Sequence, residues 1–253
     1  MAISLSVNLN KIALIRNSRE GDYPRVPVFA QMALDAGVQG ITVHPRPDQR
    51  HIRPQDVTEL AKLTAADSKA EFNIEGNPFA EPRGTYLGLI NIARAAEPDQ
   101  CTLVPDSDQQ LTSDHGFNLD KDGKRLEPLV AKLKSYGIRV SLFMDPDLRQ
   151  IQHAADLGAD RIELYTGPYA HAYDNNKARA VEIFESHVKA AEFAQSIGLG
   201  VNAGHDLNLR NMVLYRDLPG LKEVSIGHAL TVDALKMGFD HAVRAYLDVC
   251  RGQ

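Results

Sequence analysis

The sequence lacks the features that mark several large classes of protein. It contains no Trp and only two Cys, Cys101 and Cys250, among 253 residues, so it has neither a disulfide framework nor a CxxC site, and its thiols suit a reducing compartment. No apolar run approaches the roughly 18 residues that span a bilayer. The first residues, MAISLSVNLNKIAL, have no basic stretch and are interrupted by polar side chains, so we expect no signal peptide. We therefore expect a cytoplasmic protein.

Excess charge of either sign is also small. The formal net charge is -5 at pH 7 and the sequence pI is near 6.0, which removes the electrostatic footprint of a general nucleic-acid binder. Hydrophobic residues make up 43% of the chain, enough to offset the entropy cost of ordering it. No linker, low-complexity stretch or charge block divides the sequence. We therefore predict one domain over residues 1–253, with a core large enough to fold without disulfides or metals.

Short runs rich in β-branched residues alternate with longer amphipathic stretches. The runs start about 31 residues apart on average, the length of a strand, a helix and two loops. Eight such repeats with nearly continuous apolar strands predict a (β/α)8 TIM barrel, because a doubly wound sheet usually stops at five or six strands. The predicted strands are Leu5–Asn8, Gly40–His44, Glu71–Glu75, Gln100–Val104, Arg139–Met144, Arg161–Tyr165, Gly200–Ala203 and Glu223–Ile226.

Helical signals lie between several of these strands. Asp145 and Pro146 indicate an N-cap followed by proline at the first helical position, and a helix predicted over Gly84–Ala95 is interrupted by Gly88. Apolar residues at helical spacing predict four helices. Their stripes are Leu126, Leu129, Val130 and Leu133 before Gly137; Leu148, Ile151 and Ala155 before Gly158; Val181, Phe184, Val188 and Ala191 before Gly198; and Leu235, Phe239, Ala242, Tyr246 and Val249.

Polar residues gather where the predicted strands end. In TIM barrels the loops that follow the strands converge on one face and carry the chemistry. Buried ionisable groups are costly unless they are paired or functional, so a set converging on one rim predicts a site with shifted pKa values. The alternative, that each residue merely ends its strand, is reasonable for any one position but much less so for the set. The set is Asn8, Asn10, His44, Glu75, Asp145, Glu163, Asn202, His205 and His228.

Two features of this rim concern phosphate. The glycine-containing turns Asn202–His205 and Ile226–His228 follow the seventh and eighth strands, whose loops bind phosphate on backbone N–H groups in many barrels. The segment His44–His51 adds arginines directly after the second strand, and the arginine fork suits phosphate or carboxylate. Arg16 and Arg19 are expected to extend the same positive rim. A solvated basic loop is the simpler alternative for His44–His51.

Other chemistries have weaker signals. A divalent metal site could use some of the same side chains, but no HxH or HExxH spacing and no carboxylate cluster occurs. No GxSxG elbow supports a nucleophilic triad, and Cys101 lies at the start of its strand. Lys11 could form a Schiff base, but its predicted loop position does not promise the desolvation that lowers an amine pKa. The candidate metal ligands are His44, Glu75, Glu163, His205 and His228.

Several sequence blocks together resemble the pyridoxine 5′-phosphate synthase family, the ring-closing enzymes of one route to vitamin B6. The resemblance covers nearly the whole chain and is most specific in the GITVH and VNAGH blocks. The blocks are Val7-Asn8 with Arg16–Arg19; Gly40–His44 with Arg46 and Arg50–Ile52; Asn73–Glu75; Leu103–Pro105; Val140–Phe143; Ile162–Leu164 with Thr166-Gly167; Val201–His205; and Ile226–Ala229.

The resemblance implies a single-domain TIM barrel with extra helices and a long loop after the fourth strand, assembled as a ring-like homo-octamer. It also implies an activity, the condensation of 3-amino-2-oxopropyl phosphate with 1-deoxy-D-xylulose 5-phosphate. The products are pyridoxine 5′-phosphate, inorganic phosphate and water. No metal or organic cofactor, nucleic acid or membrane is implied, so the expected partners are the phosphorylated small molecules.

The resemblance also implies a role for each matched residue. His44 and Glu75 are the implied proton acceptors, His205 is the proton donor, and Glu163 stabilises cationic intermediates. The polar Pro105–Lys124 segment is a candidate closing lid. The implied substrate-binding residues are Arg19, Arg46, His51 and Thr112 for the first substrates, with Asn8, Gly227 and His228 for the phosphate-bearing end.

Three departures from the family pattern indicate a divergent subgroup. The common N-x-D-H pattern is Asn8-Leu9-Asn10-Lys11 here, and we expect Asn10 and Lys11 still to bind substrate, Lys11 as a point charge. The glycine that usually follows the donor histidine is Asp206, which we place in the same binding set although its carboxylate would repel phosphate unless it turns away. The region Gly76–Gln100 is several residues longer than usual.

Two other kinds of function remain open from the residues. One is a different phosphosugar enzyme, either a Schiff-base aldolase through Lys11 or a metal-dependent isomerase through His44, Glu75, Glu163 and His228. Borohydride trapping at Lys11 or chelator-sensitive activity would support these. The other is a catalytically silent phosphate-binding barrel. The presence of His44, Glu75 and His205 together argues against it, because a silent barrel needs none of the three.

Overall fold

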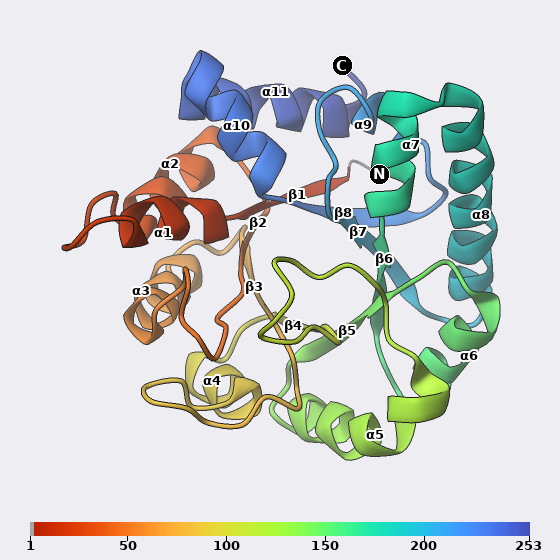
Figure 1. Ribbon diagram of the computed structural model, residues 1–253, viewed down its shortest axis with the longest axis horizontal. Helices are drawn as coiled ribbons and strands as arrows, with labels where there is room; N and C mark the ends of the chain where they lie inside the picture. The colour runs from red at the N-terminus through yellow and green to blue at the C-terminus, as the bar shows by residue number, and fades with distance from the viewer. Residues whose placement is uncertain (1–2) are drawn as a thin grey trace.

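The computed structural model describes residues 3–253 and shows a closed barrel of eight parallel strands surrounded by helices (Figure 1). Each strand pairs with its neighbours in chain order, and β8 pairs with β1 to close the barrel. The predicted (β/α)8 barrel is confirmed, and every strand boundary lies within two residues of its prediction. The strands are β1 Ser4–Asn8, β2 Gly40–Val43, β3 Glu71–Gly76, β4 Gln100–Leu103, β5 Arg139–Met144, β6 Arg161–Tyr165, β7 Gly200–Gly204 and β8 Leu221–Ile226.

The helices include the extra ones that were expected. Two helices instead of one follow β1, β6 and β8. Within residues 3–253 no helix combines the length and the apolar character needed to cross a membrane. The helices are α1 Asn10–Asn17, α2 Val26–Ala36, α3 Pro54–Ala65, α4 Leu89–Ala96, α5 Leu119–Ser135, α6 Leu148–Asp156, α7 Gly167–Asn175, α8 Lys177–Ser196, α9 Met212–Tyr215, α10 His228–Met237 and α11 Phe239–Arg251.

The start of α6 was predicted wrongly. Its N-cap is Asp147, whose carboxylate accepts the backbone N–H groups of Arg149 and Gln150. Asp145 instead accepts the backbone N–H of Gly116, at 3.1 Å, and so fastens the end of the loop that follows β4. A carboxylate cap acts only on the first turn that it can reach, and the sequence Asp-Pro-Asp offered two candidates for that position.

Four helices, α6 among them, differ from their predictions in extent or buried face. Gly238, at φ +86°, divides the predicted last helix into α10 and α11, because this left-handed backbone cannot continue an α-helix. Leu235 consequently lies on the exposed side of α10. The helix α4 begins only at Leu89, after Gly88. In α6, Leu148 is exposed although it was expected in the buried stripe, and Val181, one of the residues that predicted α8, is also exposed.

The barrel interior is polar, and the strands alternate instead of being continuously apolar. Inside, Ser6 and Thr42 share a hydroxyl hydrogen bond of 2.6 Å, and Asn73 joins Thr42 to Thr102. Apolar residues of the same strands face the helices and form the core; they include Leu5, Val7, Ile41, Val43, Phe72 and Ile74. Full burial of each such side chain contributes about 1.5–3 kcal/mol. This alternation brings Glu75, two residues beyond Asn73, into the barrel mouth.

Asn202 does not lie at the rim, contrary to its prediction. Its side-chain oxygen accepts from Arg161 at 3.1 Å, and its amide lies 3.4 Å from both Gln100 and Glu223. Those partners stand at or near the amino ends of β6, β4 and β8. Because side chains alternate along β7, Gly204 occupies the mouth position instead.

The region after β1 also differs from its prediction, since Lys11 lies in α1 and not in a loop. Arg16 is 1% exposed and does not extend a positive rim. Its guanidinium pairs with Asp56 of α3, at 2.9 Å, and donates to the backbone oxygen of His51, also at 2.9 Å. This buried pair fixes the segment after β2 against two helices.

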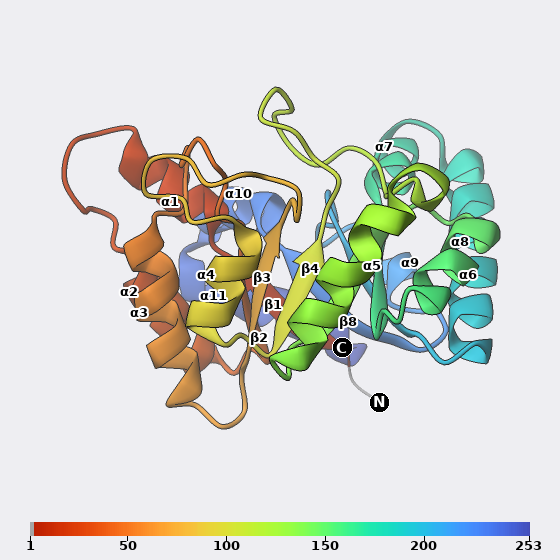
Figure 2. The ribbon, with the colours of Figure 1, turned by 90° about the horizontal axis from the view of Figure 1, so that it is seen from below.

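The long loop after β4 spans 104–118 and is shorter than the predicted lid, because α5 begins at Leu119 with Asn118 as its N-cap. Figure 2 shows this loop rising furthest above the barrel. Arg50 holds it by donating to the backbone oxygens of Gln110, at 2.9 Å, and Asp108, at 2.7 Å.

Candidate active site

A cavity of about 320 Å³ opens at the carboxyl ends of the strands. Its walls come from the end of β1, the start of α1, the end of β3, the start of α10 and the loops after β2, β4, β7 and β8. Of the catalytic and substrate-binding residues that the resemblance implied or that we added to that set, two, Glu163 and Arg19, do not line it. The others do: Asn8, Asn10, Lys11, His44, Arg46, His51, Glu75, Thr112, His205, Asp206, Gly227 and His228.

Glu75 and His44 lie side by side in this mouth. Glu75 Oε2 is 3.7 Å from His44 Nδ1, and both side chains are almost completely buried. Burial, together with the nearby charge of Asp106, raises the pKa of Glu75 to about 7. Burial and the charge of Arg46 lower the pKa of His44 well below its usual value. Near neutral pH the imidazole is therefore uncharged, while the carboxyl is poised to gain or lose a proton.

Two asparagines after β1 fix this pair. Asn8 donates its amide to Glu75 Oε2 at 3.4 Å, and its side-chain oxygen accepts the backbone N–H of Asn10. Asn10 in turn accepts the backbone N–H of His44 at 2.9 Å. Asn10 therefore acts on the backbone that presents His44, a contact that an amide oxygen makes as well as a carboxylate does.

Glu163 lies in the middle of β6 beneath the cavity. It is 1% exposed, its Oε1 is 4.0 Å from His205 Nδ1, and its Oε2 has no hydrogen-bond partner among the described residues. Burial and the charge of Glu75 raise its pKa well above the usual value. A Cβ on Gly204 would stand 2.2 Å from Glu163 Oε1, so glycine at the end of β7 makes room for this carboxyl.

His205 follows Gly204 in a left-handed backbone conformation. Its φ is +80° and that of Asp206 is +58°. The buried hydroxyl of Thr166 hydrogen-bonds the backbone oxygens of Gly204 and His205, which holds this turn. The imidazole packs on Phe143 with ring centroids 4.7 Å apart. Burial lowers the pKa of His205 to about 4.

His51 is a neutral hydrogen-bond donor in this mouth. Its Nδ1 accepts the backbone N–H of Ile52 at 3.0 Å, so the ring proton must reside on Nε2. Burial, followed by the influence of His44, lowers the pKa of His51 to about 2. The side chain can therefore bind a phosphate oxygen by donation but not by charge.

The side of the cavity formed by β8 is suited to an anion. Gly227 precedes α10 and His228 is its first residue. The first N–H groups of a helix have no partner within it, and the helix dipole favours negative charge there. A Cβ on Gly227 would lie 3.0 Å from the backbone oxygen of Asn8, so only glycine lets this turn approach β1 so closely.

Arg19 and the alternative metal ligands are not brought together. Arg19 lies exposed just beyond the end of α1. Over residues 3–253 no three His, Cys, Asp or Glu side chains are arranged to hold one metal ion. The set proposed for an isomerase, which includes Glu163 and His228, therefore does not form a coordination site.

Sequence reasoning missed Asp106. This carboxylate is 4% exposed and pairs with Arg46, which is equally buried. His44 Nε2 lies 3.4 Å from Asp106 Oδ2. Asp106 follows β4 by three residues, so the rule that selected polar residues after strand ends would have found it, had it been applied to the fourth strand.

Comparison with known proteins identifies close relatives over the whole chain. The model of the family described as "Pyridoxal phosphate biosynthesis protein PdxJ" matches residues 5–252. A pyridoxine 5′-phosphate synthase of Xanthomonas axonopodis pv. citri is 54% identical over 253 residues, covering 99% of this chain and 98% of the relative. The enzyme of the same name from Xylella fastidiosa is 53% identical, covering 97% and 94%.

Solved structures with low sequence identity share the fold. The tryptophan synthase alpha chain from Legionella pneumophila superposes with a TM-score of 0.65 at 13% identity, covering 99% of this chain and 90% of that one. A phosphoribosylanthranilate isomerase from Thermotoga maritima gives a TM-score of 0.56 at 10% identity, covering 99% and 100%. At these identities the likeness concerns the barrel alone.

Proposed function

This chain belongs to the PdxJ family of pyridoxal phosphate biosynthesis proteins, and from that premise we propose that it condenses 3-amino-2-oxopropyl phosphate with 1-deoxy-D-xylulose 5-phosphate. The products are pyridoxine 5′-phosphate, inorganic phosphate and water. The observation that carries the proposal is the buried Glu75–His44 pair beside anion-binding groups, with a Glu75 pKa of about 7.

Glu75 and His44 are the proposed proton acceptors. The amine of the first substrate attacks the ketone of the second, and imine formation, loss of phosphate and ring closure each require proton transfers. A carboxyl with a pKa of about 7 is present in both protonation states near neutrality, which suits repeated acceptance and release. The uncharged His44 beside it accepts a proton and passes it on.

Glu163 is the residue that we propose to stabilise positive charge on the reaction intermediate. Burial raises its pKa well above the usual value and so favours the neutral carboxyl, and its Oε2 has no hydrogen-bond partner among residues 3–253. A cationic iminium forming nearby would lower that pKa and favour the carboxylate. Ionisation of Glu163 would then stabilise the intermediate by a charge fixed in a dry site.

His205 is the proposed proton donor. Its pKa of about 4 leaves the substrate-free imidazole neutral at pH 7. A phosphate dianion bound close to it would raise that pKa, because a neighbouring negative charge favours the imidazolium. His205 would therefore become able to donate a proton only once substrate is bound. In the substrate-free mouth it would not take part in proton transfer.

Substrate binding is divided between two sides of the mouth. We assign the first side to the loops after β2 and β4, and the second to β1 and the start of α10. Lys11, Asn10 and Asp206 adjoin the bound phosphates, and the loop 104–118 closes over them as a lid that excludes water. The first side comprises Arg46, His51 and Thr112, without Arg19, which lies exposed outside the cavity; the second comprises Asn8, Gly227 and His228.

We further propose, from the family resemblance, a cytoplasmic homo-octamer that works without metal or organic cofactor. Its partners are the phosphorylated substrates, with no nucleic acid or membrane. The small net charge of -5 is consistent with the absence of a nucleic-acid partner.

Mixing the purified protein with the two phosphorylated substrates tests the reaction, read out as the absorbance of the new pyridine ring. Glu75→Gln and His205→Asn should each lower turnover by at least ~10²-fold, the usual contribution of general acid–base catalysis. Glu192→Gln, on the exposed face of α8, is the matched control and should leave turnover unchanged. No product from the unaltered protein would refute the reaction; wild-type rates in both site variants would refute the roles.

A further inference from the structure

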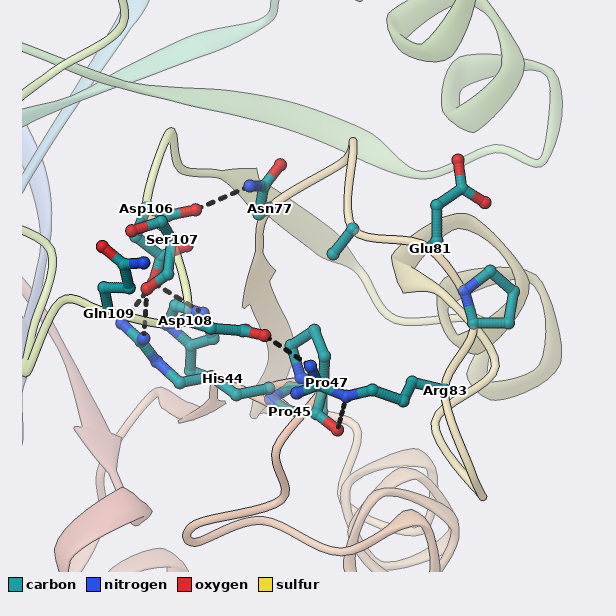
Figure 3. A pocket seen from close by; sticks show the side chains of 13 residues that line it. His44, Pro45, Pro47, Asn77, Glu81, Arg83, Asp106, Ser107, Asp108 and Gln109 are labelled. Carbon is teal, nitrogen blue, oxygen red and sulfur yellow. Dashed lines mark hydrogen bonds and ion pairs between the residues drawn. The ribbon is translucent and has the colours of Figure 1, made fainter.

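The proposed condensation assigns no role to Asp106, although it is the most completely buried carboxylate of the loop after β4. Its side chain is 4% exposed. It lines a second cavity of about 650 Å³ formed by the loops after β2, β3 and β4, and its partners His44 and Arg46 line both this cavity and the mouth. Figure 3 shows the residues that line this second cavity, with a dashed line joining Asn77 to Asp106.

Three elements hold Asp106 in place. Arg46, after β2, forms a short ion pair with its Oδ2 and also donates to the backbone oxygen of Ser107, at 3.2 Å. Asn77, after β3, donates to the backbone oxygen of Asp106 at 2.6 Å. Ser113, further along the loop, donates to Oδ2 at 3.4 Å. A carboxylate held from three sides has little freedom to reorient. Burial raises the pKa of Asp106, and the Arg46 guanidinium paired with it opposes this shift and favours the ionised form.

The same oxygen faces His44. Asp106 Oδ2 lies 3.4 Å from Nε2 and Glu75 Oε2 lies 3.7 Å from Nδ1, so the imidazole stands between two carboxyl groups. A neutral imidazole carries one proton, and the partner of one nitrogen decides where that proton resides. An ionised Asp106 can only accept. The proton therefore resides on Nε2, and the lone pair of Nδ1 faces Glu75.

From this geometry we propose that Asp106 is a positioning residue, which orients His44 and fixes its tautomer so that Nδ1 can accept the proton of Glu75. The proposal rests on the proposed function, since it assigns His44 and Glu75 to proton transfer. In that transfer the Glu75 O–H bond breaks and an Nδ1–H bond forms. The resulting imidazolium is stabilised by Asp106 on its other side, and the proton returns or moves to substrate.

Other charged groups surround this pair and have to be held constant in a test. Around His44 these are Arg46, Arg50 and Asp48 from its own loop, Glu75 and Asp106, and His205 after β7. His51 stacks edge-on with a centroid distance of 6.3 Å. Around Glu75 they are Asp106, Glu223, Arg46 and Glu163. Among these groups Asp106 is the one that contacts His44 Nε2. Its substitution therefore distinguishes the orientation of the His44 ring from the electrostatic effect of the other charges.

The test compares Asp106→Asn with Asp108→Asn. Asp108 lies two residues further along the same loop and pairs with Arg83 at the surface, so its variant controls for loop charge and folding. In Asp106→Asn we expect kcat to fall by ~10²-fold, the effect of a small misplacement of a reacting group. Asp106→Glu, which retains the charge, should recover part of this loss, and Asp108→Asn should keep the wild-type kcat.

The pH profile adds a readout that a merely structural role would not move. Asp106 raises the pKa of Glu75, so its neutralisation should shift the acid limb of kcat/KM to lower pH by about one unit. A crystal structure of the Asp106→Asn protein should show the His44 ring displaced from Glu75.

Wild-type kcat in Asp106→Asn, an equal loss in Asp108→Asn, an unmoved acid limb, or a His44 ring that keeps its place would each overturn the positioning role. Should the unaltered protein form no pyridine product, the proposed function fails. The crystal structure of the variant then still decides whether Asp106 orients His44.

Discussion

His205 and Asp206 are two consecutive residues with side chains in the left-handed region of the backbone, at φ +80° and +58°. Such residues cost free energy because Cβ crowds the neighbouring carbonyl oxygen. The family resemblance implies glycine at position 206, and glycine adopts this conformation without penalty. The departure noted in the sequence therefore has a conformational meaning: Asp206 retains strain in the turn that presents the proposed proton donor.

Asp206→Gly should stabilise the protein by about 1 kcal/mol, since it removes this strain at a compatible site. The thermal midpoint should rise by roughly 2–4 °C for a chain of this size, measured by circular dichroism or calorimetry. Asp206→Ala keeps a Cβ at positive φ and lacks the short polar side chain that lets Asp tolerate this conformation, so it should lower the midpoint. A midpoint for Asp206→Gly below that of the unaltered protein would contradict the strain.

Single-residue prediction succeeded where the position on a strand was decisive. His44, Glu75 and His205 were placed at the mouth by one rule, that polar side chains after parallel strands share a rim. The rule misplaced Asn202, because one step of alternation along β7 decides between the two ends of the barrel. It also misplaced Arg16, whose burial depends on Asp56 of a helix that is distant in sequence.

At the scale of elements, the buried pair between Arg16 and Asp56 connects α1 with α3 and with the segment that carries His51. Both side chains are almost fully excluded from water. Removing one partner of such a pair leaves an uncompensated buried charge, which is costly, whereas an exposed pair contributes little. The two kinds of pair occur on the same helix, since Glu59 of α3 pairs with Arg25 at the surface.

Asp56→Asn should therefore destabilise the protein by about 3–5 kcal/mol in urea denaturation, although it retains an oxygen that can cap α3. Glu59→Gln, the control from the same helix, should change stability by less than about 1 kcal/mol. If the two variants unfolded at the same urea concentration, Arg16 would have to find another partner or water, and the pair would not anchor the two helices.

The limits of element prediction lay at helix ends. Periodicity found the amphipathic stretches, but it could not see that Gly238 divides the last one or that Asp147 outcompetes Asp145 as a cap. Both outcomes depend on a few backbone angles and on contacts with neighbouring loops. Asp145 is used elsewhere, by Gly116, because the loop after β4 returns to β5 at that point.

At the scale of the whole molecule, the regular repeat of strands was sufficient to predict a closed barrel, whereas its polar interior was not foreseen. That interior has consequences for how stability depends on pH. Burial raises the pKa values of Glu75, Glu163 and Glu223 and lowers those of His44 and His51. On acidification the buried carboxyls favour the folded state and the buried histidines oppose it, so the two contributions partly cancel.

His187 allows the histidine contribution to be isolated, because it lies outside the mouth. It is 1% exposed on α8, and its Nδ1 is 2.6 Å from the hydroxyl oxygen of Tyr215. Burial lowers its pKa from 6.5 to about 4. Above pH 6.5 the ring is neutral in both states and contributes no pH dependence. As pH falls below that value the unfolded chain gains a proton that the folded ring refuses, so stability is lost until the folded pKa of about 4 is reached.

His187→Asn should accordingly be less stable than the unaltered protein at pH 7, through lost packing and the lost contact with Tyr215. The difference between the two proteins should shrink by about 2 kcal/mol at pH 5, because only the unaltered protein bears the protonation penalty. Urea unfolding at the two pH values measures this change. His171→Asn, on the exposed surface of α7, should show no comparable change. A stability difference for His187→Asn that stays constant from pH 7 to pH 5 would mean that the buried ring is protonated as readily as an exposed one, contrary to its enclosure.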